Sequence, residues 1–270
     1  MSGTQGVLAG AREVLSRPAA LIFLDYDGTL TPIAPHPGEA KLSERAGAVL
    51  RRLIASPGCR VAVISGRALA EVRSLVDVPG LAFAGNHGLE LAWPQGEWTH
   101  PEAAAARPWL AELADKLDLS PWPGAWLEDK RLTLTVHFRQ AGEGAGEGIA
   151  AALAALAAPW AERLEVRGGK MSLEVRPRLA WDKGQALLRL REILCPETEA
   201  GLFYAGDDLT DEDAFRVLRT LGSGLSVLVG SPRDTLADLR VEDTAELLEV
   251  LEALAAERPW EGRRRGGAGK

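Results

Sequence analysis

The sequence has few cysteines and no excess of basic residues. Only Cys59 and Cys195 occur among its 270 residues, which excludes a disulfide framework and a cysteine-based zinc site. Asp and Glu outnumber Lys and Arg by 38 to 31, so the net charge is −7. A protein without a basic excess lacks the usual electrostatic means of binding nucleic acid or anionic membranes. We therefore expect no nucleic-acid partner and no membrane partner, and a small-molecule ligand instead.

Long apolar runs are also missing. No stretch approaches the roughly 18 apolar residues of a membrane-spanning helix, and residues 1–20 lack the apolar centre of a signal peptide. Both cysteines stand in apolar contexts typical of buried thiols, which fits a reducing compartment. These absences predict a cytoplasmic protein, which we expect to be a monomer. The hydrophobic content of 46% supports a well-buried core.

Short apolar runs that end in small or acidic residues recur along the chain. Residues 21–24, 60–64 and 202–205 are typical of buried parallel strands. Segments with helical spacing, such as 43–54, lie between them. The alternation predicts an α/β fold with a Rossmann-like, doubly wound parallel sheet, whose chemistry belongs at the carboxyl ends of the strands.

The character of the sequence changes from about residue 96, where tryptophans and prolines crowd together. Residues 131–139 and 170–176 alternate strictly between apolar and polar types, which predicts strands with one face in a core and one polar face. Met171 is expected on the apolar face. We therefore predict an inserted α/β cap domain. The predicted parts are a catalytic core of residues 1–100 and 178–262, the cap of residues 101–177, and a disordered tail of residues 263–270.

Two clusters of acidic residues follow buried strands. Asp25 and Asp27 come directly after residues 21–24, and Gly28 lets the chain turn sharply beyond them. The second cluster, after residues 202–205, consists of Asp207, Asp208 and Asp211. The carboxyl ends of parallel strands meet at one sheet edge, so the clusters are expected to meet. Several carboxylates in one pocket repel one another unless a hard cation is present, and all-oxygen ligands favour Mg²⁺. Acidic loop residues are also common solvated turn formers.

The segment 25–30 (DYDGTL) resembles the DxDGT signature of the haloacid-dehalogenase-like phosphatases. Three further motifs of that family follow in order along the chain: Ser65 after the second strand, Lys183, and the pair Asp207 and Asp208. A single DxD would be weak support, whereas four ordered motifs are specific. The resemblance implies a phosphatase with this fold and an aspartyl-phosphate intermediate.

The resemblance also implies a role for each motif residue. Asp25 would be the nucleophile, and Asp27 would protonate the leaving oxygen and later activate water. Ser65 would hydrogen-bond the phosphate, and Lys183 would offset its charge. Magnesium would be held by the side chains of Asp25 and Asp207 and the main-chain oxygen of Asp27, with Asp208 and Asp211 supporting the site.

Further matches across the chain resemble the trehalose-6-phosphate phosphatase family. They are the segments 65–67 (SGR), 86–88 (NHG), 127–130 (LEDK), 137–139 (HFR), 170–177 (KMSLEVRP), 181–184 (WDKG) and 206–215 (GDDLTDEDAF). The resemblance implies hydrolysis of trehalose 6-phosphate, a cap that closes over the active site, and a trehalose-6-phosphate synthase as candidate partner. Asn86 departs from the family pattern, because many members carry an acidic residue there.

The expected sugar contacts lie mainly in the predicted cap. They are Arg67, Asn86, His87, Glu128, Lys130, His137, Arg139, Lys170, Glu174 and Arg176. Each of these also fits an ordinary surface role; Glu174 and Lys170, for example, could form a cross-strand ion pair. The tryptophans fit core packing better than sugar binding, and none is assigned to the site.

Three other functions are consistent with parts of the pattern. A phosphatase acting on sucrose phosphate or mannosyl-phosphoglycerate would keep the core residues and change the cap contacts. A glycosyltransferase would use a DxD motif to bind a metal-nucleotide, but here the DxD belongs to an ordered set of phosphatase motifs. A non-catalytic phosphosugar sensor would ordinarily lack the nucleophile, and Asp25 is present.

Overall fold

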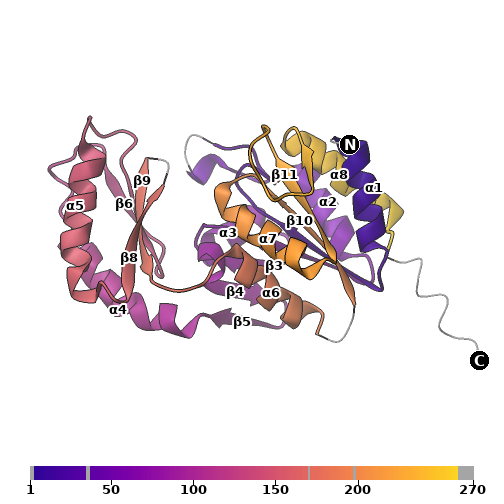
Figure 1. The fold of residues 1–270 in the computed structure, drawn as a ribbon, viewed down its shortest axis with the longest axis horizontal. Coiled ribbons are helices and arrows are strands. Elements are labelled where there is room, and N and C mark those ends of the chain that lie inside the picture. Colours follow the sequence, from indigo (N-terminus) through magenta and orange to yellow (C-terminus); the bar gives the residue numbers. More distant parts are fainter. Residues whose placement is uncertain (1–2, 35–36, 170, 197–198, 261–270) are drawn as a thin grey trace, which may run out of the picture. The chain divides into compact units, whose positions relative to one another are not determined.

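The computed structural model describes residues 3–34, 37–169, 171–196 and 199–260 (Figure 1). The chain forms two compact units. Met1–Trp98 and Trp181–Lys270 form the core unit, and Thr99–Ala180 form the insert unit. The predicted boundaries, after residues 100 and 177, lie close to these divisions. The predicted tail at 263–270 lies outside the described residues.

An eight-stranded sheet forms the centre of the core unit, in the order β12-β11-β10-β1-β2-β3-β4-β5. Its six parallel strands are β1 (Ala19–Leu24), β2 (Cys59–Ile64), β3 (Ala82–Gly85), β10 (Ala200–Gly206), β11 (Gly224–Val229) and β12 (Leu239–Val241). Every residue of β1 is buried, as a strand covered on both faces requires. The predicted parallel α/β sheet is confirmed.

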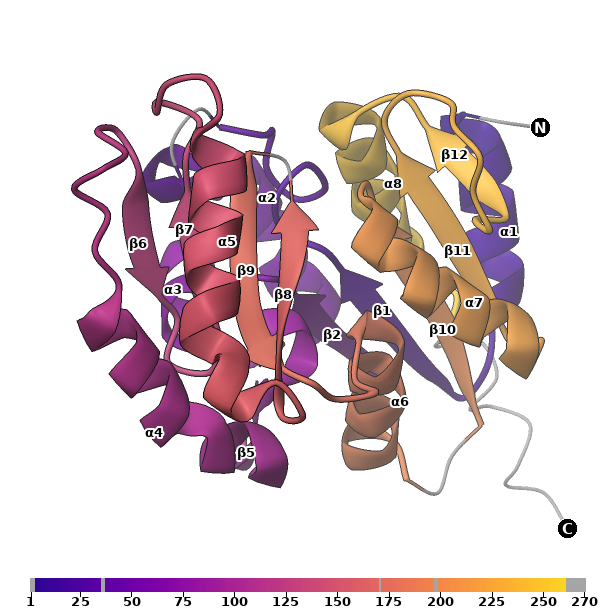
Figure 2. The ribbon, with the colours of Figure 1, turned by 60° about the vertical axis from the view of Figure 1, so that its left-hand side comes forward.

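Helices cover both faces of this sheet. They are α1 (Thr4–Leu15), α2 (Glu44–Ile54), α3 (Leu69–Val76), α6 (Lys183–Leu194), α7 (Glu212–Leu221) and α8 (Thr244–Glu257). Ile22 and Leu24 of β1 pack in one apolar cluster with α1, α2, α3 and α8, whereas Leu21 and Phe23 pack in another with α6 and α7 (Figure 2). The two-residue period of the strand thus distributes β1 between two cores, as a doubly wound fold requires.

An antiparallel edge completes the core sheet. Strand β4 (Glu90–Trp93) pairs antiparallel with β3, and β5 (Gly96–Thr99) follows it. Trp93 and Trp98 pack against the cluster around α6 and α7. Strand β5 thus lies within residues 1–100, the first predicted segment of the catalytic core, although the character of the sequence already changes at about residue 96.

The insert unit is an antiparallel sheet with helices on one face. Its strands run in the order β6 (Trp126–Asp129), β7 (Leu134–His137), β9 (Ser172–Pro177) and β8 (Leu164–Gly169). Leu134, Val136 and Val175 pack against α4 (Pro101–Lys116) and α5 (Ala145–Ala157), which Figure 2 shows against the sheet. The residues that alternate with these, such as Glu128, Thr135 and Glu174, occupy the opposite face, which we call the polar face.

Two details of the predicted insert strands differ from the structure. Strand β7 ends at His137, and the chain then turns, with the Ala141 N–H donating to the Phe138 carbonyl. Arg139 consequently lies in an exposed turn and not on the strand. Met171 precedes β9 in a left-handed conformation, with φ of 60°, and is 45% exposed, so its predicted place on the apolar face is wrong.

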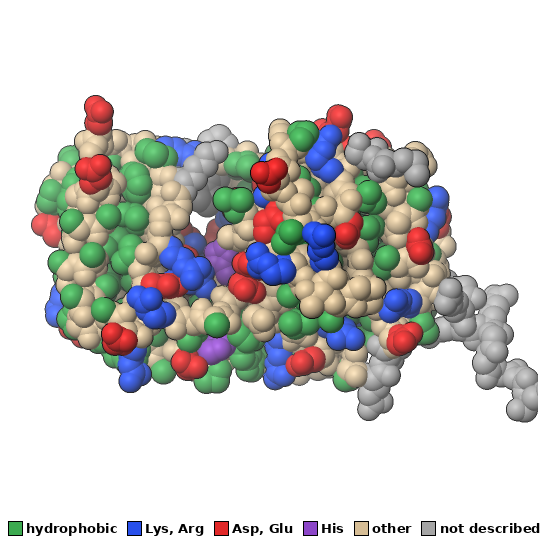
Figure 3. Space-filling model, in the orientation of Figure 1, with side chains coloured by type: hydrophobic (Ala, Val, Ile, Leu, Met, Phe, Trp, Pro, Cys, Tyr) green, Lys and Arg blue, Asp and Glu red, His purple; other side chains and the backbone are tan. Residues whose placement is uncertain are grey.

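Short 3₁₀ segments connect several of these elements. They are η1 (Pro37–Glu39), η2 (Asn86–Gly88), η3 (Ala158–Trp160) and η4 (Leu209–Asp211). Among the described residues, no helix combines the length and apolar character needed to cross a membrane. Figure 3 shows acidic and basic side chains interspersed over the face that it draws. That pattern agrees with the absence of a basic excess in the sequence.

Candidate active site

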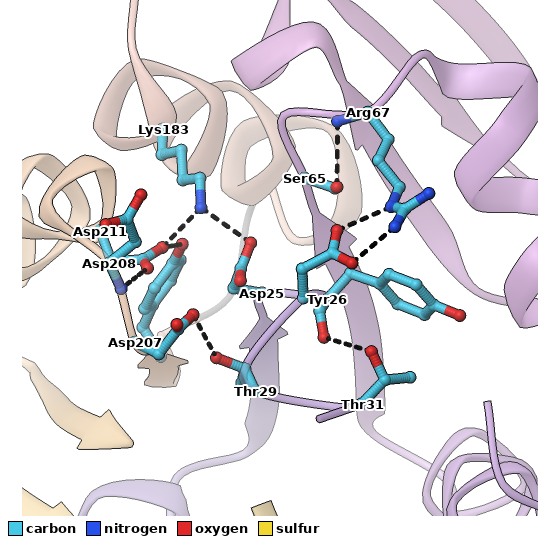
Figure 4. A network of polar contacts seen from close by, with 12 residues as sticks. Asp25, Tyr26, Thr29, Thr31, Ser65, Arg67, Lys183, Asp207, Asp208 and Asp211 are labelled. Carbon is cyan, nitrogen blue, oxygen red and sulfur yellow. Dashed lines mark hydrogen bonds and ion pairs between the residues drawn. The ribbon is translucent and has the colours of Figure 1, made fainter. Parts of the chain in front are cut away.

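Both acidic clusters lie at the same edge of the core sheet. Asp25 follows β1 and Asp207 follows β10, and these strands pair in parallel with Leu24 opposite Ala205. Asp25, Asp207 and Asp211 each place a carboxylate oxygen within 4.8 Å of the others (Figure 4). Asp25 is only 5% exposed, and its N–H donates to the Ala205 carbonyl. The structure thus brings together side chains that are 182 residues apart in the sequence, from 25 to 207.

Lys183 neutralises part of this cluster. Its Nζ lies 2.7 Å from Asp25 Oδ1 and 2.8 Å from Asp211 Oδ1 (Figure 4). Lys183 is the first residue of α6, which Asp182 caps by accepting from the Gln185 N–H. Burial by itself would lower the pKa of Lys183, but the charges of Asp211 and Asp25 outweigh it and raise that pKa. Lys183 therefore stays protonated between the two carboxylates.

Asp211 is engaged by protein groups on both oxygens. Oδ1 also accepts from the Tyr204 hydroxyl at 2.6 Å, and Oδ2 accepts from the Asp208 N–H at 2.9 Å. Asp211 is fully buried, and a Cβ on Gly206 would lie 2.2 Å from its Cγ, so only glycine allows this approach. Asp208 is exposed and caps η4. Asp211 and Asp208 therefore shape the loop around Asp207 and Lys183.

The donor set fits a magnesium ion. Three carboxylates lie together, and the ammonium group of Lys183 pairs with two of them, which leaves excess negative charge. Burial, followed by the charge of Asp211, raises the pKa of Asp207 to about 6, and burial also raises that of Asp25. A hard cation would relieve this repulsion, and carboxylates are its preferred ligands. Gly28 leaves room at this point, because a Cβ there would lie 2.1 Å from Asp207 Oδ2.

Asp27 is held by Arg67. Nε and Nη2 of Arg67 donate to the two carboxylate oxygens of Asp27, each at 2.7 Å, in the bidentate geometry that suits a guanidinium. Arg67 also pairs with Glu71 and lies over the ring of Tyr26, 5.6 Å from its centroid. Asp27 remains 37% exposed, whereas the side chain of Arg67 is 10% exposed. Arg67, predicted to contact substrate, thus also positions the candidate general acid.

The loops after β2 and β3 interlock beside this pair. The Ser65 hydroxyl oxygen accepts from the Arg67 N–H at 3.1 Å, and the Ser65 carbonyl accepts from the His87 N–H at 3.0 Å. His87 is half-buried. Asn86, by contrast, is fully buried, and its Nδ2 donates to Glu90 Oε2 at 2.9 Å. The amide of Asn86, which is predicted to contact the sugar, thus takes part in the packing of this loop.

Five other predicted contacts form one network on the polar face of the insert unit. Lys130 Nζ lies 3.9 Å from Glu128 and 4.0 Å from Glu174. His137 Nε2 lies 2.7 Å from Glu128 Oε2, and Arg176 lies 3.9 Å from Glu174. The network residues are Glu128, Lys130, His137, Glu174 and Arg176. Arg139 lies outside it on the exposed turn, and Lys170 lies outside the described residues.

Arg233 has no counterpart among the predicted site residues. Its Nη2 donates to the Asp208 carbonyl at 2.9 Å, and its Nη1 lies 2.8 Å from Glu212, as an ion pair without hydrogen-bond alignment. Arg233 therefore clamps the loop that carries Asp207. Tyr204 was missed as well, because its place in a buried apolar run resembles ordinary core packing. No motif spacing marks Arg233, which reaches the loop from 25 residues further along the chain.

This fold and this arrangement of acids and lysine define a haloacid-dehalogenase-like protein. Within that class, the chain belongs to the trehalose-phosphatase family, because the model of that family, described as trehalose-phosphatase, matches residues 23–257.

Individual relatives of the chain differ in name and in length. A trehalose-phosphate phosphatase of Mycobacterium avium is 39% identical over 262 residues, which cover 93% of this chain and 66% of that protein. The C-terminal domain of trehalose-6-phosphate phosphatase from C. albicans has a TM-score of 0.76 at 26% identity, covering 95% of this chain and 98% of that one. A Mycobacterium tuberculosis protein named as an uncharacterized glycosyl hydrolase is 42% identical over 89% of this chain. The chain spans 66% and 18%, respectively, of the two mycobacterial proteins.

Proposed function

We propose that this protein hydrolyses trehalose 6-phosphate to trehalose and phosphate through an aspartyl phosphate on Asp25. The observation that carries the proposal is the buried Asp25 carboxylate, which Lys183 holds at 2.7 Å beside Asp207. A carboxylate kept in place by a cation at a charged sheet edge is suited to attack phosphorus. Membership of the trehalose-phosphatase family supports the substrate.

In the first half-reaction, a carboxylate oxygen of Asp25 attacks phosphorus and the bond from phosphorus to the sugar oxygen breaks. Asp27 gives its proton to that oxygen, so trehalose leaves as an alcohol. Arg67 donates to both oxygens of the ionised Asp27, so one of these hydrogen bonds is given up when Asp27 carries the proton. Lys183 offsets the negative charge of the transferring phosphoryl group, and the Ser65 hydroxyl donates to one of its oxygens.

In the second half-reaction, Asp27 takes a proton from a water molecule, whose oxygen attacks phosphorus. The bond from phosphorus to Asp25 breaks, which releases phosphate and restores the carboxylate. One carboxyl group thus serves as acid and then as base. The sum of the two steps is a monoester plus water giving an alcohol plus phosphate.

Asp25 and Asp207 would hold Mg²⁺ through their side chains, with the main-chain oxygen of Asp27 as the third protein ligand. Asp208 and Asp211 would support them from behind. When bound, the ion supplies positive charge that keeps Asp25 ionised and offsets the charge of the phosphate. The raised pKa values of Asp25 and Asp207 support this part of the proposal.

The proposed sugar contacts are the network on the polar face together with His87. Carboxylates accept hydrogen bonds from sugar hydroxyls, and Lys130 and Arg176 donate to hydroxyl oxygens. Sucrose phosphate or mannosyl-phosphoglycerate as substrate would require the same core residues and a different use of this face. We also propose a cytoplasmic monomer and a trehalose-6-phosphate synthase as its protein partner.

The testing experiment measures phosphate release with Mg²⁺, with and without a chelator. The panel holds trehalose 6-phosphate, sucrose 6-phosphate, glucose 6-phosphate, mannosyl-phosphoglycerate and an aryl phosphate. We expect a chelator-sensitive preference for trehalose 6-phosphate. Preference for another sugar phosphate would overturn the substrate and keep the core mechanism, whereas no activity on any of them would favour a non-catalytic sensor.

Asp25→Asn is the matching variant, because it keeps the shape of the side chain and removes the nucleophile. Turnover is expected to fall by about 10⁴-fold or more, as for other nucleophile removals. Asp115→Asn, at an exposed position of α4, is the control and should keep full activity. Circular dichroism checks that both variants remain folded. Substantial turnover by folded Asp25→Asn would contradict a nucleophilic Asp25.

A further inference from the structure

The polar face of the insert unit carries an exposed tryptophan. Trp126 opens β6 and pairs in register with His137 of β7. The two rings are stacked, with centroids 4.2 Å apart and planes 18° from parallel, and Trp126 is 45% exposed. A large aromatic side chain that keeps this much exposed surface, on the same face as Glu128, is not accounted for by core packing.

The Trp126 ring is held in position by His137 and Glu128. His137 covers one face of the indole, and Nε2 of the same histidine lies 2.7 Å from Glu128 Oε2. Glu128 is in turn 3.9 Å from Lys130. The tryptophan therefore rests on a hydrogen-bonded, charged support that limits its rotation, and a preorganised ring loses little entropy when a ligand binds to it.

A buried hydroxyl lies beside this ring system. Thr135 is 5% exposed and stands in register between Glu128 and Glu174 on the polar face. Within the described part of the chain, its Oγ1 has no hydrogen-bond partner. Buried polar atoms are nearly always paired with protein groups or ordered water, so this hydroxyl between two glutamates is available for a hydrogen bond to a ligand.

These groups match the chemistry of a pyranose ring. A sugar ring presents C–H groups on one face, which suit the negative face of an indole, and hydroxyl groups around its rim. Carboxylates such as Glu128 and Glu174 accept from those hydroxyls, and Thr135 can donate or accept. An apolar peptide would cover these ion-paired carboxylates with a surface that offers them no hydrogen bonds.

We propose that Trp126 is a stacking platform for a pyranose ring of the substrate and that Thr135 completes the same subsite with a hydrogen bond. The inference rests on the proposed function, which it deepens by assigning sugar recognition to residues outside the family motifs. Trp126 then contributes to binding of a sugar phosphate and not to the chemical step. Its loss raises KM for sugar substrates more than it lowers kcat.

Trp126→Ala and Trp126→Phe in the full chain test the platform. Loss of one stacked ring is expected to raise KM for trehalose 6-phosphate about tenfold in Trp126→Ala. Trp126→Phe retains an aromatic face and should recover most of that loss. The rise in KM for an aryl phosphate, which has no sugar, should be much smaller. Met171→Ala is the matched control, because Met171 is equally exposed, at 45%, in the same unit.

Binding of the sugar itself separates this inference from the proposed function. Saturation-transfer NMR with trehalose, maltose and sucrose is run on Asp25→Asn and on the double variant with Trp126→Ala. Loss of the sugar signal in the double variant supports the platform even if wild type fails to hydrolyse trehalose 6-phosphate. Equal signals in the two proteins, equal KM losses on sugar and aryl substrates, or no sugar signal at all would overturn it.

Discussion

Replacing Lys183 by methionine tests how the buried charges of the active site are balanced. The Nζ group lies 2.7 Å from Asp25 and 2.8 Å from Asp211, and the lysine side chain is 4% exposed. Methionine keeps most of the volume and removes the charge, so two buried carboxylates lose their common partner. Breaking a buried ion pair in this way costs about 3–5 kcal/mol of unfolding free energy.

The pH dependence of this loss follows from the carboxylates that remain. Without Lys183, burial keeps the folded-state pKa of Asp25 above its unfolded value of 3.8. A carboxyl group whose pKa is higher in the folded state favours folding when it is protonated. Its ionisation therefore lowers the unfolding free energy increasingly as the pH rises toward the folded-state pKa. Lys183→Met should therefore be less destabilising at about pH 5 than at about pH 7.5.

Urea unfolding with a chelator present measures both effects, and Lys116→Met provides the matched control. Lys116 pairs with Glu112 at 2.6 Å on the surface of α4, where its side chain is 60% exposed. Such an exposed pair contributes only about 0.3–0.5 kcal/mol. The reasoning would be refuted if Lys183→Met lowered the unfolding free energy no more than Lys116→Met, or if its effect did not change with pH.

Two further predictions concern Arg233 and Cys59. Arg233→Met should raise the Mg²⁺ concentration needed for half-maximal activity about tenfold, because residues behind a metal ligand tune its affinity to that extent. Mg²⁺-induced thermal stabilisation provides a second readout. The control is Arg216→Met, because Arg216 forms an ion pair on α7 with its side chain 60% exposed. An unchanged Mg²⁺ dependence in Arg233→Met would count against the role of Arg233 in holding the loop. Burial raises the pKa of Cys59 from 9.0 to about 12, so its thiol should resist alkylation at about pH 8 until the protein unfolds. Since the thiolate is disfavoured in the folded state, stability should fall as the pH rises from 9.0 toward 12; peptide mapping that finds Cys59 alkylated in folded protein would contradict this burial.

The meeting of the two acidic clusters could be predicted because each cluster has a local sequence signal. An apolar run that stops at Asp25, and another that stops before Asp207, indicate strand ends, and parallel pairing brings those ends to one edge. Each signal depends only on neighbouring residues, and the clusters meet once β1 and β10 pair in one sheet. The register of that pair then sets the distances between the carboxylates.

The edge of the sheet and the turns of the insert could not be predicted in the same way. Strands β4 and β5 have four residues each, too few for a two-residue period to stand out. Arg139 continues the alternation of residues 131–137, but the chain leaves the strand at a turn that the alternation does not show. Met171 likewise follows the polar–apolar pattern while its backbone adopts the left-handed region of a turn.

Side-chain partners distant in the sequence explain the remaining differences. Asn86 belongs to the segment 86–88 that resembles the family, and its amide lies 2.9 Å from the buried Glu90. An aspartate at position 86 would place two carboxylates together there, so the neutral amide suits this neighbour. Trp126 shows the reverse case. Its residue type predicts core packing, and only the register with His137 reveals that it lies on the polar face. A tryptophan can therefore pack in a core or contact a ligand, depending on the strand face that it occupies. For Trp126 the alternation along β6 sets this face, whereas composition does not.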